Sequence, residues 1–333
     1  MTVPAHLHAL PAPMLVVGGY GYRNVGDEAM LAGLLHLLGP IEITVVSRSP
    51  AETTALHGVA TVSVAGAANA LRRHRTVLIG GGGLFGRDMG LLGRLLPAYG
   101  LVASALGRTI ALTGIGLDDD RPPSRLMLRL AAAARQVAVR DQASARVLAA
   151  HDIAAHVIGD LSSYMPAAPV EVGAELLRQA GVDLRRPVVG VALTAVRSEL
   201  SAVAAAAVAF AVERLPELEF CLIPMSQHPF VERHNDLLLA RRIQAVVPRA
   251  RILEGVHHPS AVLSAVGRLS ALVGMRYHSL LFAKRADVPI IPISYASKVD
   301  SWLHESGTAA VPPTGAAITA ALADRMARAA VPA

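Results

Sequence analysis

The sequence predicts an α/β fold made of two Rossmann-like domains that face each other across a cleft. Two observations carry this prediction. Short runs rich in β-branched residues alternate with longer segments in which alanine and leucine recur at helical spacing, and the alternation starts again in the second half of the chain. The runs are almost continuously apolar, as expected for strands of a parallel sheet that helices cover on both faces.

The first half of the chain supplies the strands of the first predicted domain. They are residues 14–18, 41–47, 76–80, 109–116, 136–140 and 155–159. Residues 160–173 interrupt this alternation and contain two prolines and several small polar residues. We expect the domain boundary there, which gives an N-terminal domain over residues 1–165, a C-terminal domain over 166–310 and a terminal helix over 311–333.

The second half repeats the pattern. Its predicted strands are residues 187–193, 218–224, 271–274 and 288–294. Helical segments are predicted near 198–214, 230–247, 259–268 and 277–286, with a last helix over 315–330. Open parallel sheets bind ligands at the carboxyl ends of their strands, so the loops that follow these strands are the places to look for a site.

The composition fits a globular protein with a large core, because 53% of the 333 residues are hydrophobic and only 17% are charged. The single cysteine excludes an internal disulfide bond and fits a reducing compartment. No apolar run reaches the roughly 18 residues that a membrane-spanning helix needs, and the first residues do not resemble a signal peptide. We therefore expect a cytoplasmic protein.

The formal charge of +6 comes mainly from arginines that are spread along the chain. A solvated arginine-rich surface is the simplest interpretation. Binding of small anionic substrates and attraction to a negatively charged membrane surface are alternatives. Nucleic acid is not an expected partner, because aromatic residues make up only 4% of the chain and do not alternate with basic ones.

A glycine-rich loop, VVGGYGYRNVGDEAM, follows the first predicted strand. A dinucleotide fingerprint would need a third glycine after Gly19 and Gly21, and Asn24 stands at that position. The loop also lacks the lysine of a P-loop. What remains is a backbone that approaches a ligand closely, with polar tips from Tyr20, Tyr22 and Asn24. Asp27 has two interpretations, as a ligand contact or as the N-cap of the next helix.

A second loop, IGGGGLFGRDMG, places four consecutive glycines after another strand. Such a run is unfavourable in chain entropy, so we expect its backbone N–H groups to approach an anion or a sugar hydroxyl. Tight passage of the chain between domains is the alternative.

A third cluster lies in residues 271–302, where Arg276, His278 and Ser279 follow a strand and open a helix. Lys298 follows the next strand. Two cations that flank a histidine would suit a small dianion that needs proton transfer. A helix-start histidine that is satisfied by the backbone is the alternative. The chain has no H-E-x-x-H and no C-x-x-C motif, so we expect no metal site.

Four segments together resemble the polysaccharide pyruvyltransferase family, particularly the bacterial cell-surface-anchoring type. They are GGYGYRNVGDEAML, IGGGGLF, AVRDQAS and GMRYHSLLFAKRADVPIIPISYASKV, and the similarity runs over residues 14–302. The resemblance implies a two-domain GT-B fold. It also implies transfer of pyruvate from phosphoenolpyruvate onto two hydroxyls of a sugar, which forms a cyclic ketal and releases phosphate.

By resemblance, the catalytic residues are Arg140, from the R-D motif, and Arg276 and His278, from the R-x-H motif. The phosphate and carboxylate of phosphoenolpyruvate independently suit arginine and lysine, so Arg276, Ser279 and Lys298 are the candidate donor-binding residues. The sequence departs from the family pattern after Asp160, where GDLSSY replaces the usual Asp-Pro. The candidates for the glycine loops and acceptor binding are Gly19, Tyr20, Gly21, Asn24, Asp27, Gly81, Gly82 and Gly83.

The expected partners are phosphoenolpyruvate and a sugar or lipid-linked glycan acceptor, in a cell-wall or exopolysaccharide precursor. The chemistry needs no cofactor, and a peripheral position at the inner face of the membrane is compatible with it. One alternative is a sugar-nucleotide-dependent glycosyltransferase of the same fold, which would release a nucleotide instead of phosphate. The other is a non-catalytic protein that binds carbohydrates or anions.

Overall fold

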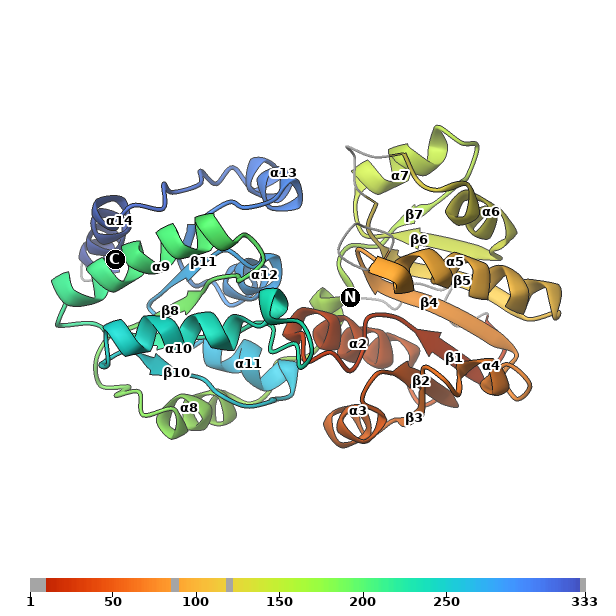
Figure 1. The fold of residues 1–333 in the computed structure, drawn as a ribbon, viewed down its shortest axis with the longest axis horizontal. Coiled ribbons are helices and arrows are strands. Elements are labelled where there is room, and N and C mark those ends of the chain that lie inside the picture. The colour runs from red at the N-terminus through yellow and green to blue at the C-terminus, as the bar shows by residue number, and fades with distance from the viewer. Residues whose placement is uncertain (1–9, 85–89, 118–121, 330–333) are drawn as a thin grey trace. The chain divides into compact units, whose positions relative to one another are not determined.

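A computed structural model describes residues 10–84, 90–117 and 122–329. The chain divides into two compact units (Figure 1). The first comprises Met1–Tyr22 and Asp27–Pro166, and the second comprises Arg23–Gly26 and Ala167–Ala333. The short segment Arg23–Gly26 therefore belongs to the second unit although it lies early in the chain, which the sequence analysis did not anticipate.

Within the described residues, the first unit contains a seven-stranded parallel sheet in the order β3-β2-β1-β4-β5-β6-β7. Its strands are β1 (Met14–Val17), β2 (Ile43–Ser47), β3 (Ala60–Ser63), β4 (Thr76–Gly82), β5 (Thr109–Ile115), β6 (Gln136–Val139) and β7 (His156–Val157). Its helices are α2 (Val25–Leu38, which begins in the second unit), α3 (Pro50–His57), α4 (Ala67–Ala70), α5 (Gly90–Ala105), α6 (Arg125–Ala133), α7 (Gln142–Ala149) and the 3₁₀ helix η2 (Leu161–Tyr164).

Alternate residues of each central strand enter two separate cores. Leu15 and Val17 of β1 pack with residues of α4, α5, α6 and α7. Met14 and Val16 point the other way and pack with α2 and Leu161. Because side chains alternate across a strand, a strand with helices on both faces must be apolar at every position, and β1 is buried throughout.

The second unit contains a five-stranded parallel sheet, counted over the described residues, in the order β10-β9-β8-β11-β12. Its strands are β8 (Val188–Ala192), β9 (Glu219–Leu222), β10 (Arg251–Ile252), β11 (Ala271–Gly274) and β12 (Ile290–Pro292). Its helices are α8 (Val170–Gln179), α9 (Ser198–Arg214), η3 (Glu232–His234), α10 (Asp236–Val246), α11 (Pro259–Val266), α12 (Tyr277–Arg285), α13 (Ser297–Glu305) and α14 (Gly315–Ala329).

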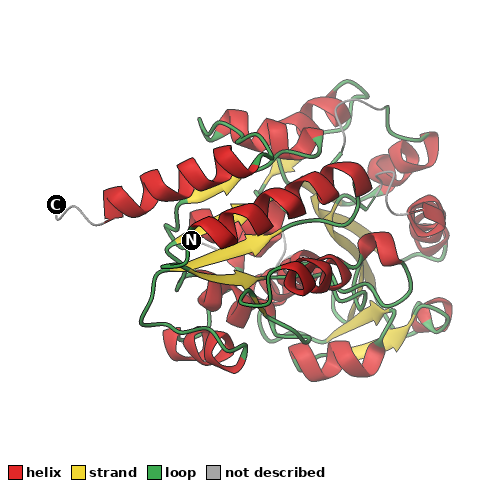
Figure 2. Ribbon diagram, turned by 60° about the vertical axis from the view of Figure 1, so that its left-hand side comes forward, coloured by secondary structure: helices red, strands yellow, loops and turns green. Residues whose placement is uncertain are grey.

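Helices cover this second sheet as well (Figure 2). Residues of α9, α10 and α14 pack with β8, β9 and β11 in one core, and α8 and α12 contact α11. Cys221 of β9 is fully buried, and this burial raises the pKa of its thiol to about 12. Among the helices that the structure describes, none is both long and apolar enough to cross a membrane.

The predicted α/β class with parallel sheets is confirmed. Two edge strands, β3 and β10, were missed. Strand β3 reads ATVS and is exposed or half-buried at each position, so it lacks the continuous apolar run of a central strand. Strand β10 is only two residues long, which is too short for any periodic pattern.

Helix α2 packs closely on the segment that ends the first unit. A Cβ atom on Gly33 would overlap the backbone carbonyl oxygen of Leu161. Backbone atoms cannot swing aside as the end of a side chain can, so a glycine is required there.

We expect Gly33→Ala to lower the free energy of unfolding by about 1–3 kcal/mol, the usual range for overpacking, despite the better helix propensity of alanine. Denaturant titration would measure the change. Gly267→Ala is the control, because its added methyl group would meet its nearest neighbours at 3.4 Å, an ordinary contact distance. Equal stability of both variants would contradict this account of the α2 packing.

Candidate functional site

Each sheet has one place where its strand order reverses direction. In the first unit the reversal lies between β1 and β4, and in the second it lies between β8 and β11. Open α/β sheets bind ligands beside the carboxyl ends of the strands at such a switch point. The first predicted glycine loop follows β1, the second glycine run forms the end of β4, and Arg276 and His278 follow β11. Three of the four sequence motifs therefore lie at the switch points, whereas Arg140 follows β6.

Tyr20 does not present its hydroxyl to a ligand, contrary to expectation. Its side chain is buried at 1% exposure, and the hydroxyl donates a hydrogen bond to the carbonyl oxygen of Gly80 at 2.8 Å. Burial, with the nearby carboxylates of Asp27 and Glu28, raises the pKa of this phenol. The phenol therefore stays protonated and joins the two glycine loops to each other.

Gly21 has the positive φ that the sequence predicted, at +80°. Its amide N–H donates to Glu28 Oε1 at 2.8 Å, while Glu28 Oε2 pairs with His57 Nε2 at 2.8 Å. A Cβ atom at Gly21 would overlap the hydroxyl of Ser47 and would lie 2.6 Å from the amide nitrogen of Ser49. The imidazole of His57 is buried. A buried hydrogen bond between Glu28 and His57 thus fixes the carboxylate that holds this loop.

Asn24, and not Asp27, caps helix α2. The side-chain oxygen of Asn24 accepts a hydrogen bond from the Gly26 amide N–H at 3.1 Å, and the helix begins at Val25. Asp27 lies in the first turn, where its carboxylate faces both glycine loops. A Cβ atom on Gly19 would lie 3.3 Å from Asp27 Oδ2, and one on Gly82 would lie 3.6 Å from Asp27 Oδ1. Asp27 is therefore the acidic group at the switch point of the first unit.

The glycines at the end of β4, and Gly83 just after it, differ in what their backbone contacts require. Gly81 and Gly82 have φ values of +86° and +79°, and both lie against Met30 of α2. Their glycine identity is explained by backbone conformation and packing. Gly83 is exposed, and no described atom would lie within 4 Å of a Cβ atom there. The continuation of this motif, residues 85–89, lies outside the described residues.

Arg140 directly follows β6, and its orientation comes from its neighbour Asp141. The guanidinium Nε donates to Asp141 Oδ2 at 3.1 Å, and the Arg140 side chain is 14% exposed. Asp141 also caps α7, because its Oδ1 accepts from the amide and the hydroxyl of Ser144 at 2.8 and 2.6 Å. Burial raises the pKa of Asp141, but these hydrogen bonds and the Arg140 charge outweigh it and lower the pKa overall. The carboxylate therefore stays charged beside Arg140.

Gly116 makes room for the Arg140 guanidinium. A Cβ atom at this position would lie 2.7 Å from Arg140 Nη2 and 2.8 Å from Cζ. Gly116 follows β5, the strand beside β6. The sequence analysis did not single out this glycine, because the contact joins two strands that are separate in the chain.

In the second unit, Arg276 is held by a buried carboxylate that the sequence analysis missed. Arg276 Nε donates to Asp236 Oδ2 at 2.8 Å, and Nη2 donates to Oδ1 at 2.7 Å. The Asp236 side chain is 1% exposed. It also accepts from the amide N–H groups of Ala195 and Ser226, each at 3.0 Å. One carboxylate thus joins the loops that follow β8, β9 and β11.

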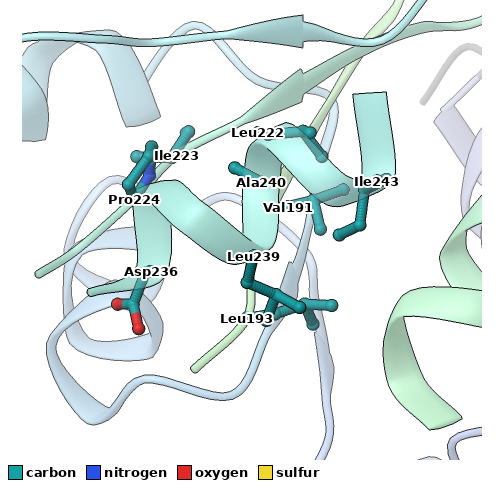
Figure 3. Close-up of a pocket in the computed structure, with 9 residues that line it drawn as sticks. All are labelled: Val191, Leu193, Leu222, Ile223, Pro224, Asp236, Leu239, Ala240 and Ile243. Atoms are coloured by element: carbon teal, nitrogen blue, oxygen red, sulfur yellow. The ribbon is translucent and has the colours of Figure 1, made fainter. Parts of the chain in front are cut away.

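Asp236 is the one ionisable residue among the nine that Figure 3 draws around a small pocket beneath α10. The other eight are apolar: Val191, Leu193, Leu222, Ile223, Pro224, Leu239, Ala240 and Ile243. The pocket holds about 10 Å³, which is near the minimum space for a single water molecule. It is a packing void and not a substrate site.

His278 and Ser279 open helix α12, as predicted, but they play different parts. Ser279 is fully buried, and its hydroxyl donates to the Arg276 carbonyl oxygen at 2.6 Å, so it stabilises the turn and does not bind a donor. The His278 ring stands edge-on to Tyr277, with centroids 5.3 Å apart. Lys298 is the second residue of α13, and its side chain lies outside the described residues.

His278 lies against the N-terminal end of α2. A Cβ atom on Gly26 would overlap the imidazole Nδ1. The neighbouring backbone is fixed in the second unit, because the Val25 N–H donates to the Met225 carbonyl at 2.9 Å. The Gln227 N–H likewise donates to the Arg23 carbonyl at 2.9 Å. Segment 23–26 therefore forms one wall beside the histidine.

Two doubly wound α/β units, each with polar residues at its switch point, define a GT-B-like protein, and solved structures agree. MnaA of S. aureus, in a co-structure with UDP, has a TM-score of 0.66 at 11% identity, covering 95% of this chain and 88% of that chain. UDP-GlcNAc 2-epimerase from Neisseria meningitidis, bound to UDP-GlcNAc, scores 0.64 at 11% identity, with 93% and 90% covered. A glycosyltransferase from Rickettsia africae scores 0.57 at 9% identity, with 96% and 89% covered. At such identities the likeness shows the fold alone.

The family follows from the sequence. A family model described as polysaccharide pyruvyl transferase matches residues 24–297, and the chain belongs to that family. No curated protein matches the sequence. Among the residues that the structure describes, no three His, Cys, Asp or Glu side chains are grouped as metal ligands would be.

We expect Asp236→Ala to lower the free energy of unfolding by about 3–5 kcal/mol, because the change leaves a guanidinium and two amide N–H groups without their buried acceptor. Chemical denaturation would measure the loss. Asp183→Ala is a matched control, since Asp183 also makes a two-point contact with an arginine, Arg185, but on the exposed surface. A surface pair contributes little, so the control should be nearly unchanged. Similar losses in both variants would contradict the role assigned to Asp236.

Proposed function

We propose that the protein transfers pyruvate from phosphoenolpyruvate onto two hydroxyls of a sugar in a cell-wall or exopolysaccharide precursor. The product is a cyclic ketal, and phosphate is released. Membership of the polysaccharide pyruvyl transferase family supports the reaction class. The observation that carries the proposal is Arg276, held by Asp236 at a switch point, two residues before His278. We also propose the cell-surface-anchoring type, on its motifs, and a cytoplasmic location, where phosphoenolpyruvate is made.

Arg276 is proposed to attract the donor through its charge, and not through a two-point hydrogen bond from Nε and Nη2. Phosphoenolpyruvate carries a phosphate and a carboxylate, which arginine binds well. Asp236 occupies Nε and Nη2 of Arg276, so these two nitrogens are already engaged as a pair. Arg140 and Lys298 are the further cations proposed for the donor. Of these, Arg140 has an orientation fixed by Asp141.

His278 is proposed as the group that moves the proton. C2 of phosphoenolpyruvate becomes electrophilic when C3 takes a proton, so a general acid is required. The first sugar hydroxyl then bonds to C2 and loses its proton. The second hydroxyl replaces the phosphate at C2, and its proton leaves with the phosphate. An imidazole can donate or accept a proton, so it can act as the acid or as the base.

Asp27 is the group we propose for the acceptor. Its carboxylate lies beside Gly19 and Gly82 at the switch point of the first unit. A carboxylate accepts hydrogen bonds from sugar hydroxyls, and Asp27 is half-buried. Tyr20, Gly21 and Asn24 fix the shape of this loop through internal hydrogen bonds.

A direct assay separates the proposal from its rivals. The purified chain would be incubated with phosphoenolpyruvate and candidate glycans, and phosphate would be measured together with the product by mass spectrometry. Release of phosphate with formation of a pyruvyl ketal supports the proposal. Release of a nucleotide from a sugar nucleotide would instead show a glycosyltransferase. Binding of a glycan with neither product would indicate a non-catalytic protein.

We expect His278→Ala to fold and to bind phosphoenolpyruvate, because the Arg276–Asp236 pair does not depend on the imidazole. Turnover should fall by about 10²–10⁴-fold, the usual range for loss of a general acid or base. A melting curve, a calorimetric titration and a phosphate-release assay on one sample would test this. His36→Ala, on the exposed side of α2, is the control. Normal turnover of well-folded His278→Ala would remove His278 from the mechanism.

We expect Gly116→Ala to keep the fold while it weakens donor binding. The added methyl group meets the end of a flexible side chain, so Arg140 can move away at little cost in stability. A displaced guanidinium near the reacting groups can reduce the rate by about 10²-fold. Measurements of KM for phosphoenolpyruvate and of the melting temperature would test this: KM should rise while the melting temperature stays unchanged. Gly66→Ala, where the methyl group meets its neighbours at 3.4 Å, should leave both unchanged.

A further inference from the structure

Helix α5 of the first unit exposes a row of apolar side chains along one side. The exposed side chains of Leu95, Val102 and Leu106, the last just beyond the helix, are 54%, 55% and 58% accessible. Ala98 and Ala105 lie at positions between them, so the spacing follows one side of a helix. The opposite side enters the core, where Leu96 and Ala103 are buried. The apolar face extends for about 16 Å at the rise of an α-helix.

Such a face is unusual for a helix on the surface of a soluble unit. A helix that is apolar all round is ordinarily buried all round, whereas surface helices carry polar residues on the outer side. Helix α9 in the second unit follows that rule: it exposes Val203 and Phe210 but also carries Glu199, Glu213 and Arg214. Among the side chains of α5 that the structure describes, none is charged; the side chain of Arg94 lies outside them.

Helix α6 lies beside α5 (Figure 1). It exposes Leu126, at 42%, between the exposed arginines Arg125 and Arg129. The sequences of the two helices contain three arginines and no Asp or Glu, and Arg108 follows α5. Three aspartates precede α6 in the sequence at 118–120, and these lie outside the described residues.

We propose that the α5–α6 face docks on the surface of an anionic lipid bilayer. An apolar strip enters the boundary between head groups and acyl chains, and the arginines beside it meet the lipid phosphates, as in other interfacial helices. The two helix sequences carry positive charges and no carboxylates, so their charge is complementary to that of an anionic surface. This inference does not rest on the proposed reaction, because it concerns a helix face and not a strand-end loop.

The test is co-sedimentation of the full chain with vesicles of phosphatidylcholine alone and of phosphatidylcholine with phosphatidylglycerol. We expect binding only to the anionic vesicles, and we expect it to weaken as salt rises. The double variant Val102→Glu and Leu106→Glu should bind at least about tenfold more weakly, since it removes apolar contact and adds negative charge. Each of Arg125→Gln and Arg129→Gln should weaken binding about fivefold.

The matched controls are Val203→Glu, an equally exposed valine on α9, and Arg242→Gln, an exposed arginine on α10. Both should sediment as the wild type does, and melting curves should show all variants folded. Failure of the wild type to bind anionic vesicles would overturn the proposal, as would equal loss in the controls. If sedimentation velocity instead shows a dimer that the α5 double variant dissociates, the face is an interface between copies and the membrane proposal is wrong.

Discussion

The carboxylate of Asp236 is the interaction on which the site of the second unit depends. It accepts four hydrogen bonds, two from a guanidinium and two from backbone amides. A buried charge is strongly unfavourable unless its partners are complete, so none of the four can leave without a large loss of stability. The ends of three strands are therefore fixed together by the solvation requirement of one side chain.

In the first unit, too, a carboxylate with several hydrogen-bond donors orients an arginine. Asp141 receives hydrogen bonds from the N-terminal turn of α7 and also orients Arg140. In each unit a carboxylate at a helix start, where the helix dipole favours negative charge, holds an arginine that follows a β-strand. The two carboxylates therefore fix the directions of both arginines.

Sequence patterns predicted what depends on neighbouring residues in the chain. Buried strands such as β1 and β4 are continuous apolar runs, and a positive φ at Gly21 follows from a glycine in a tight loop. The pair of Arg276 with Asp236 spans 40 residues, and no local pattern reports it. Tyr20 and Ser279 were placed in the site because their hydroxyls are polar, but each hydroxyl is satisfied by a backbone carbonyl inside the fold. Polarity alone cannot distinguish a ligand contact from such an internal hydrogen bond.

The assignment of Arg23–Gly26 to the second unit has a consequence for how the chain acquires its structure. These residues form backbone hydrogen bonds with Met225 and Gln227. The segment is synthesised early, but its partners follow about two hundred residues later in the chain. Contacts of such long sequence separation slow folding. A fragment that starts after Pro166 would lack this segment and would leave the N–H of Gln227 and the carbonyl of Met225 without their backbone partners. The second unit is therefore discontinuous in sequence, and division of the gene at the apparent boundary would not reproduce it.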